Sequence, residues 1–256
     1  ADEEPAGFFD IAALGIILPD ETGNYRLDEN ITRAEFSVAI ARLRGEEAVV
    51  FSMSADTKFT DVPQNAWYAR YVNYIIASGI VDNVTGNEFK PSAPISRDDA
   101  LRYMVNALGY GMTVNNPGDY SAKAASLKLT KNLPSGNNFT FSRGAFVTLA
   151  YNALDVRLMV QSVYGENAEF QISNLTLRNW LANSNLDGVY RSKGIVQANA
   201  FTWLDTPRAG LRDDQVVING DIYYTGETDA ENYLGMEVEF YAQKNEDELP
   251  VLVAVH

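Results

Sequence analysis

The feature of this sequence that most constrains its fold is an internal repeat. A glycine at the end of a short apolar run precedes an arginine by eighteen residues at two places, Gly15 to Arg33 and Gly79 to Arg97. An aromatic residue stands eight positions before the arginine in both copies, so the loop between the two also keeps its register. Repeats of this length indicate a fold built by packing copies of one unit together.

A third copy of the repeat is degenerate. Its loop is shorter and contains Gly136 and Phe139, and it ends in FSRGA at Arg143. Lys128 stands where the other copies have glycine, and Ala145 replaces the acid of the motif. The chain therefore contains three units, of which the last has diverged most.

Each copy is predicted to form a helix, a loop and a second helix. In the second copy, apolar residues at helical spacing over residues 69–76 are followed by Gly79, a helix-ending residue, and Ser96 is placed to cap the next helix. Thr32 and Glu35 form a capping box in the first copy. One such unit cannot bury its own apolar stripe, so we expect the copies to share a core.

Composition excludes several classes of function. The 256 residues suggest about two folded units, and the net charge of −14 disfavours binding to nucleic acid or to an anionic membrane. Because the chain has no cysteine, it has no residues for thiol nucleophiles, disulfides or zinc–thiolate centres, and its single histidine is the last residue, His256. We expect neither cofactor nor metal, and no apolar run is long enough for a membrane span.

The second copy resembles a complete S-layer homology (SLH) domain over residues 59–110. It carries FTDV around Asp61, the pair Trp67 and Tyr68, the SGI helix end, a Gly/Phe loop, and ISRDD where the family usually has ITRAE. Residues 8–44 resemble another copy, with ITRAE intact.

The front half of the first copy departs from the family pattern. Asp10 lies only five residues before Gly15, whereas Asp61 lies eighteen before Gly79. Asp10 is therefore not the counterpart of the FTDV aspartate. That half of the repeat is missing or remodelled.

The SLH resemblance implies a three-lobed helical assembly that holds an extracellular protein on a secondary cell-wall polysaccharide, often pyruvylated, of Gram-positive bacteria. It implies a location in the cell wall or S-layer, with a signal peptide removed before Ala1. It also implies that motif side chains line grooves that bind the glycan. The carried-over ligand-binding residues are Arg97, Asp61, Trp67 and Gly79 from the full copy, Arg33 and Gly15 from the first, and Arg143 from the third.

The position of the motif arginine predicts an anion site. With Thr32 as N-cap, Arg33 is the first helical residue, where a cation is unfavourable by roughly 0.3–1 kcal/mol. The same placement recurs after Ser96 and Ser142. A guanidinium beside unpaired helix-start amides would form a cradle for a carboxylate such as a pyruvyl ketal. The alternative interpretation is that these arginines pair with nearby acids and that Trp67 only closes the core.

The C-terminal part alternates like β-structure. Asn219-Gly220 between residues 216–218 and 222–224 predicts a hairpin with a type I′ turn. Further short strands suggest a small antiparallel β-barrel or sandwich, which resembles an uncharacterised β module of Firmicutes surface proteins. The other expected strands are 169–172, 194–198, 202–204, 236–242 and 250–255, with a short helix from Thr176 to Trp180.

The predicted fold class is α+β: a pseudo-threefold SLH-like helix bundle followed by the β domain. The function predicted is noncatalytic anchoring to an anionic cell-wall glycan. The alternatives are a structural surface-assembly subunit that contacts copies of itself or other surface proteins, and a wall-glycan hydrolase with its acids on the β domain. The predicted domains are 1–50 (repeat 1), 51–112 (repeat 2), 113–160 (repeat 3) and 161–256 (β domain).

Overall fold

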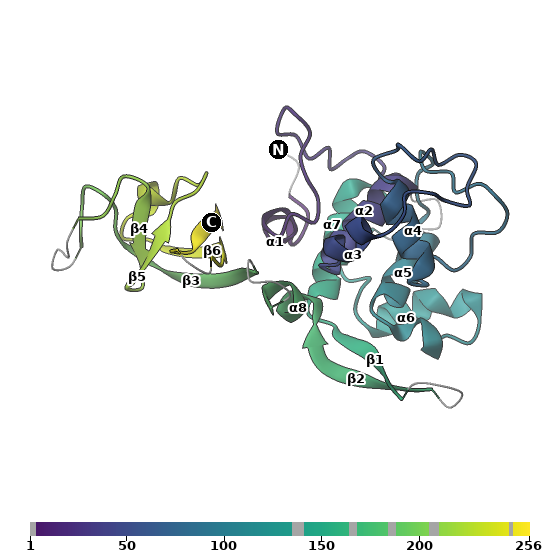
Figure 1. Cartoon of the computed structure of the whole chain (residues 1–256). Helices are drawn as coiled ribbons and strands as arrows, with labels where there is room; N and C mark the ends of the chain where they lie inside the picture. Colours follow the sequence, from purple (N-terminus) through teal and green to yellow (C-terminus); the bar gives the residue numbers. More distant parts are fainter. Residues whose placement is uncertain (1–3, 135–140, 164–167, 184–187, 205–209, 246–247) are drawn as a thin grey trace. The chain divides into compact units, whose positions relative to one another are not determined.

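The computed structural model describes residues 4–134, 141–163, 168–183, 188–204, 210–245 and 248–256. The chain divides into two compact units between Trp180 and Leu181 (Figure 1). The boundary expected at residue 160 falls inside a strand, β1 (Arg157–Val163), so the first unit extends past the repeats. Gly136 and Phe139 of the third loop lie outside the described residues.

The first unit is mainly helical. Three of its helices, α2, α5 and α7, each begin at a motif arginine. The α-helices are α1 (Phe8–Ala13), α2 (Arg33–Leu43), α3 (Glu47–Ser52), α4 (Ala69–Ala77), α5 (Arg97–Ala107), α6 (Tyr120–Ser126) and α7 (Arg143–Leu154), and the 3₁₀-helices are η1 (Tyr110–Thr113) and η2 (Pro117–Asp119).

The three motif helices share one core, as expected of three units that cannot bury their stripes alone. Phe36 of α2 lies 5.3 Å from Phe146 of α7 and 6.1 Å from Tyr103 of α5, measured between ring centroids. All three rings are buried and meet edge to face, the arrangement that aromatic quadrupoles favour. The predicted assembly of three helical repeats is therefore confirmed.

The predicted caps form at all three motif helices. The Thr32 hydroxyl accepts the Glu35 amide while the Glu35 carboxylate accepts the Thr32 amide, which completes the capping box. Ser96 and Ser142 accept the amide three residues on, each at 3.1 Å. These caps fix where each arginine leaves the chain.

The first helix of each repeat ends in a left-handed residue. Gly15 and Gly79 have φ of 66° and 71°, and Lys128, their counterpart in the third repeat, has φ of 60°. Lys128 keeps the bonding of a helix end, since its amide donates to Ala125 and the Leu129 amide donates to Ala124. The third repeat thus preserves the turn without its glycine, at a steric cost.

We predict that Lys128→Gly raises the free energy of unfolding by about 0.5–1 kcal/mol, because glycine adopts positive φ without the Cβ clash. The control is Lys123→Gly inside α6, which should lower it by about 0.5–1 kcal/mol. Urea denaturation of both variants measures the difference. Destabilisation by Lys128→Gly would contradict the assignment of strain to this residue.

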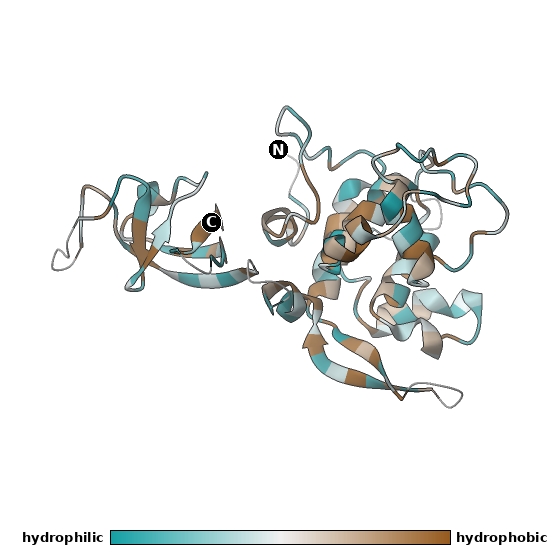
Figure 2. Ribbon diagram, viewed as in Figure 1, coloured by the Kyte–Doolittle hydropathy of each residue, from teal (hydrophilic) through white to brown (hydrophobic). Residues whose placement is uncertain are grey.

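A hairpin and a short helix complete the first unit. Strands β1 and β2 (Glu169–Thr176) pair antiparallel, and apolar and polar residues alternate over the first part of β2 (Figure 2). The helix expected after Thr176 is α8 (Leu177–Asn183), which spans the division between the units, and the Thr176 hydroxyl accepts the Asn179 amide. Arg178 pairs with Asp10 at 3.1 Å, which agrees with Asp10 not being the FTDV aspartate.

The second unit is a closed five-stranded barrel in the order β3-β4-β5-β7-β6, with β3 pairing both β4 and β6. Its apolar core includes Val216, Phe240 and Leu252. The elements are β3 (Val189–Ala198), β4 (Gln215–Ile218), β5 (Asp221–Tyr224), the 3₁₀-helix η3 (Ala230–Tyr233), β6 (Glu237–Gln243) and β7 (Val251–Val255).

Two details of the predicted β domain need correction. The barrel is not wholly antiparallel, because β5 and β7 run parallel at Tyr224 and Val251. Directions cannot alternate around a ring with an odd number of strands, so a closed barrel of five must contain a parallel pair. The strand expected at residues 202–204 is reduced to an isolated bridge between Trp203 and Ala198.

The predicted type I′ hairpin turn is confirmed. Asn219 and Gly220 join β4 to β5 with φ of 50° and 92°, and both central residues of such a turn need positive φ. No helix among the described residues combines the length and apolar character needed to cross a membrane.

Candidate functional site

The motif arginine of the first repeat binds the loop of the second. The Arg33 Nε donates to the Phe89 carbonyl at 2.8 Å, and the guanidinium lies 4.8 Å from the centroid of the Phe89 ring. Its Nη1 lies 3.7 Å from a carboxylate oxygen of Asp99. Only 14% of the Arg33 side chain is exposed. Its contacts with Phe89 and Asp99 join the first repeat to the second.

The motif arginine of the third repeat makes the same contact with the first. The Arg143 Nε donates to the Tyr25 carbonyl at 2.8 Å, and Tyr25 stands eight residues before its motif arginine, as Phe89 does. Arg143 also donates to the Leu18 carbonyl and to Glu35, each at 3.1 Å. Burial lowers the pKa of the Arg143 guanidinium from its ordinary value, and the nearby Glu35 carboxylate opposes that shift.

The helix-start amides of α2 are not free, so the predicted anion cradle is wrong there. The Arg33 amide donates to Ala93 at 2.9 Å and the Ala34 amide donates to Pro91 at 3.0 Å. Carbonyls of the neighbouring repeat thus satisfy the donors that an anion would need. The sequence could not reveal that these amides are already hydrogen-bonded, because the acceptors belong to another copy.

The helix-start amides of α7 also donate to carbonyls of another repeat, so they form no anion cradle either. The Arg143 amide donates to Glu29 and the Gly144 amide to Leu27, both at 2.8 Å. These acceptors lie four and six residues before Arg33, the positions that Ala93 and Pro91 hold before Arg97. The register of the contact between repeats is therefore identical at the two helices.

Arg97, the motif arginine of the full copy, lies apart from these two contacts. It is the first residue of α5 and is partly buried. Its Nε is buried, and no acceptor for it occurs in the described part of the chain.

Asp61 organises the loop that receives Arg33. Its carboxylate accepts the Phe89 amide at 2.8 Å and the Lys90 amide at 2.6 Å, and Lys90 has φ of 59°. In the first repeat, which lacks an FTDV aspartate, the Asn24 side chain accepts the amide of Arg26, the counterpart of Lys90, at 2.7 Å.

Gly15 and Gly79 are explained by their helix ends. A Cβ on either glycine would meet nothing within 4 Å, so both backbones stand open. Positive φ, and not close packing, therefore accounts for glycine at these two positions.

We predict that Asp61→Ala lowers the free energy of unfolding by about 2 kcal/mol, because two charge-assisted hydrogen bonds to backbone amides are lost. Asp56→Ala on the same segment is the control, since that side chain is exposed and should change stability by less than about 0.5 kcal/mol. Equal effects in urea denaturation would show that the Asp61 carboxylate does not organise the loop.

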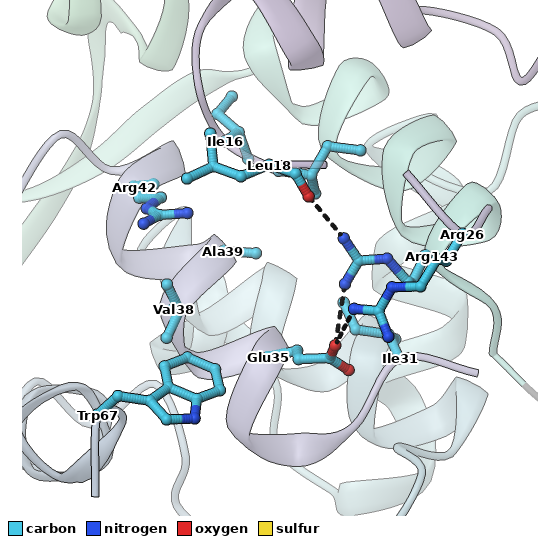
Figure 3. Close-up of a pocket in the computed structure, with 11 residues that line it drawn as sticks. Ile16, Leu18, Arg26, Ile31, Glu35, Val38, Ala39, Arg42, Trp67 and Arg143 are labelled. Atoms are coloured by element: carbon cyan, nitrogen blue, oxygen red, sulfur yellow. Dashed lines mark hydrogen bonds and ion pairs between the residues drawn. The ribbon is translucent and has the colours of Figure 1, made fainter. Parts of the chain in front are cut away.

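A groove of about 290 Å³ lies where parts of all three repeats meet (Figure 3). Its wall is α2, with Trp67 of the second repeat at one end and Arg143 of the third at the other. The residue Trp67 is 65% exposed, and its ring packs edge to face against Tyr68. The lining residues are Ile16, Ile17, Leu18, Arg26, Ile31, Glu35, Val38, Ala39, Arg42, Trp67 and Arg143.

Among the described residues, three arginines and one glutamate line the groove, and two of these arginines also have counter-ions outside the lining, Arg42 with Glu47 and Arg26 with Glu29. Both carboxylate oxygens of Glu35 are engaged: Oε1 accepts Arg26 at 3.2 Å and Arg143 at 3.1 Å, while Oε2 accepts the Thr32 amide and hydroxyl. Glu35 therefore holds two guanidinium groups at the groove floor.

The corresponding face of α5 is covered by a polar network that joins its side chains to those of Asp82 and Asn83. The Tyr103 hydroxyl donates to Asn83 at 2.7 Å, and the Asn83 amide donates to Asp99 at 2.9 Å. Arg102 pairs with Asp82 at 2.6 Å and lies over the Tyr120 ring. This network thus occupies the face of α5 that corresponds to the groove-lining face of α2.

The structure groups the predicted residues differently from the sequence analysis. Trp67 shares a groove with Arg143 of the degenerate third copy, whereas Arg33 and Asp61 meet at the Phe89 loop. Arg26 and Arg42 were missed. Arg26 had a detectable signal, because it and Lys90 are basic residues at the same position of the repeat, directly after the aromatic residue.

Comparison with known proteins identifies relatives. Residues 58–101 match the model of the S-layer homology domain. The chain is 32% identical over 169 residues to a middle cell wall protein of Brevibacillus brevis and to a surface layer protein of Brevibacillus choshinensis. These alignments cover 65% of this chain but 16% and 15% of the relatives.

A cell surface protein of Thermoanaerobacter kivui is 26% identical over 235 residues, which is 90% of this chain and 28% of that protein. The chain thus spans less than a third of the length of these relatives. Residues 58–101 of this chain belong to the S-layer homology domain family.

Proposed function

We propose that this chain is a noncatalytic anchor that binds an anionic, pyruvylated cell-wall polysaccharide in the groove on α2. An SLH domain and relatives named as cell-wall and surface-layer proteins indicate a surface protein associated with the cell wall or S-layer. The observation that carries the finer proposal is the groove itself, which places the exposed Trp67 beside a cluster of guanidinium groups.

Trp67 supplies the apolar part of the proposed site. The indole of this exposed residue, at the edge of a groove, gives a flat face on which a sugar ring can stack. Val38 and Ala39 of α2 also line this end of the groove, so the sugar would be held against apolar surface on one side.

The arginines supply the charged part. Arg26, Arg42 and Arg143 place their guanidinium groups in the lining, and Arg26 and Arg143 share the carboxylate of Glu35. The net charge of −14 opposes an anionic polymer, but screening over about 8 Å at physiological ionic strength confines that repulsion. The local excess of arginine therefore favours a carboxylate in the groove.

A hydrolytic function is disfavoured for this groove. Glycoside hydrolysis ordinarily needs two carboxyl groups across the scissile bond, and Glu35 is the only acid among the described residues that line the groove. Two guanidinium groups and the helix cap already engage Glu35, which leaves it poorly placed as a general acid. Retention of the glycan is the function that this arrangement supports.

We predict that Trp67→Ala weakens binding to isolated cell-wall sacculi of a Gram-positive bacterium about tenfold, since burying the face of a large ring is worth roughly 1.5 kcal/mol. Co-sedimentation at increasing protein concentration measures the affinity. Phe201→Ala is the matched control, because Phe201 is an exposed aromatic residue of the second unit and should not affect binding. Equal affinity of the two variants would refute a role for Trp67.

We further predict that mild acid removal of pyruvate from the wall polymer reduces binding of the unmodified protein at least about tenfold, because the charge-assisted hydrogen bonds to the carboxylate are lost. The same treatment should reduce the salt dependence of binding. Undiminished binding to the stripped polymer would contradict an anionic ligand.

A further inference from the structure

We propose that Arg26, which is not part of the repeat motif, is the residue that grips the ligand carboxylate, and that Arg143 is a positioning residue. This inference rests on the proposed function of the groove. It assigns separate tasks to two arginines that share one counter-ion, Glu35.

Arg143 is built into the framework. Its residue is 6% exposed, and its guanidinium is tied to the carbonyls of Tyr25 and Leu18 as well as to Glu35. Moving it toward a ligand would break its hydrogen bonds to these two carbonyls and its ion pair with Glu35 together, which costs more than one new hydrogen bond gains. Arg143 therefore holds the groove wall together and adds a fixed positive charge behind the ligand.

Arg26 is placed to respond to a ligand. Its side chain is 37% exposed and lines the same groove. Its outward partner is Glu29, at 3.3 Å, whose side chain is 60% exposed. Such exposed ion pairs contribute little net free energy, so a ligand carboxylate can replace Glu29 at small cost.

The backbone fixes where Arg26 acts. Its φ is 52°, and its amide donates to the Asn24 side chain, so the residue is held in a turn whose geometry Lys90 repeats at φ 59°. Lys90 does not line the groove. The chain thus provides an internal control: a basic residue at the equivalent position that is outside the site.

The test uses isothermal titration with a methyl hexopyranoside that carries a 4,6-pyruvyl ketal, and with its methyl ester, which lacks the charge. Arg26→Gln should weaken binding of the acid about tenfold and leave binding of the ester unchanged. Arg26→Lys should recover most of the affinity. Lys90→Gln should leave the affinity for both ligands unchanged.

Glu29→Gln gives the complementary measurement. Removing the competing carboxylate should tighten binding of the acid severalfold while leaving the ester unchanged, a gain that no loss of structure can imitate. The Glu29 carbonyl, which accepts the Arg143 amide, is kept in this variant. Thermal unfolding of each variant verifies its fold.

The outcomes separate this inference from the function on which it rests. If Arg26→Gln and Glu29→Gln both bind the acid like the parent while Trp67→Ala binds it more weakly, the role of Arg26 is wrong and the glycan site stands. If the unmodified protein binds acid and ester equally, recognition of an anionic ligand is wrong, and this inference fails with it.

Discussion

The helical unit depends on one interaction: the start of a motif helix in one repeat is closed by loop carbonyls of another. At α2 and α7 the first two amides and the arginine Nε all donate to the neighbouring loop. Helix-start amides must find acceptors when they are buried, and here the acceptors come from outside the repeat. At these two helices, the hydrogen bonds that cap the helix start therefore also pack one repeat against another.

The same contact prepares the groove. Asp61 holds the loop that receives Arg33, and Asn24 performs part of this task in the first repeat. Because the loop at Tyr25 is fixed by Arg143, the next residue, Arg26, emerges beside Glu35. The position of Arg26 and Glu35 at the charged end of the groove thus follows from the contact between the first and third repeats.

Much of the fold could be predicted from local chemistry. Glycine spacing, the caps at Thr32 and Ser96, and the turn at Asn219-Gly220 are signals that act over a few residues, and the structure contains each of them. The parallel pairing of β5 and β7 was missed because it follows from closing a five-stranded ring, which no local pattern encodes.

The site was harder to predict than the fold. A sequence shows which residues each repeat contains but not which copies become neighbours, so Trp67 was grouped with Arg97 and is found with Arg143. For the same reason the helix-start amides were expected to be free, although carbonyls such as that of Ala93 occupy them.

The two arginine contacts run in one direction, from the first repeat to the second and from the third to the first. Each donor and its acceptor therefore belong to different copies of the repeat. A substitution in one copy alters the surroundings of another, so the effects of substitutions far apart in the chain are coupled. A change in the loop of the first copy at Tyr25 acts directly on Arg143 of the third.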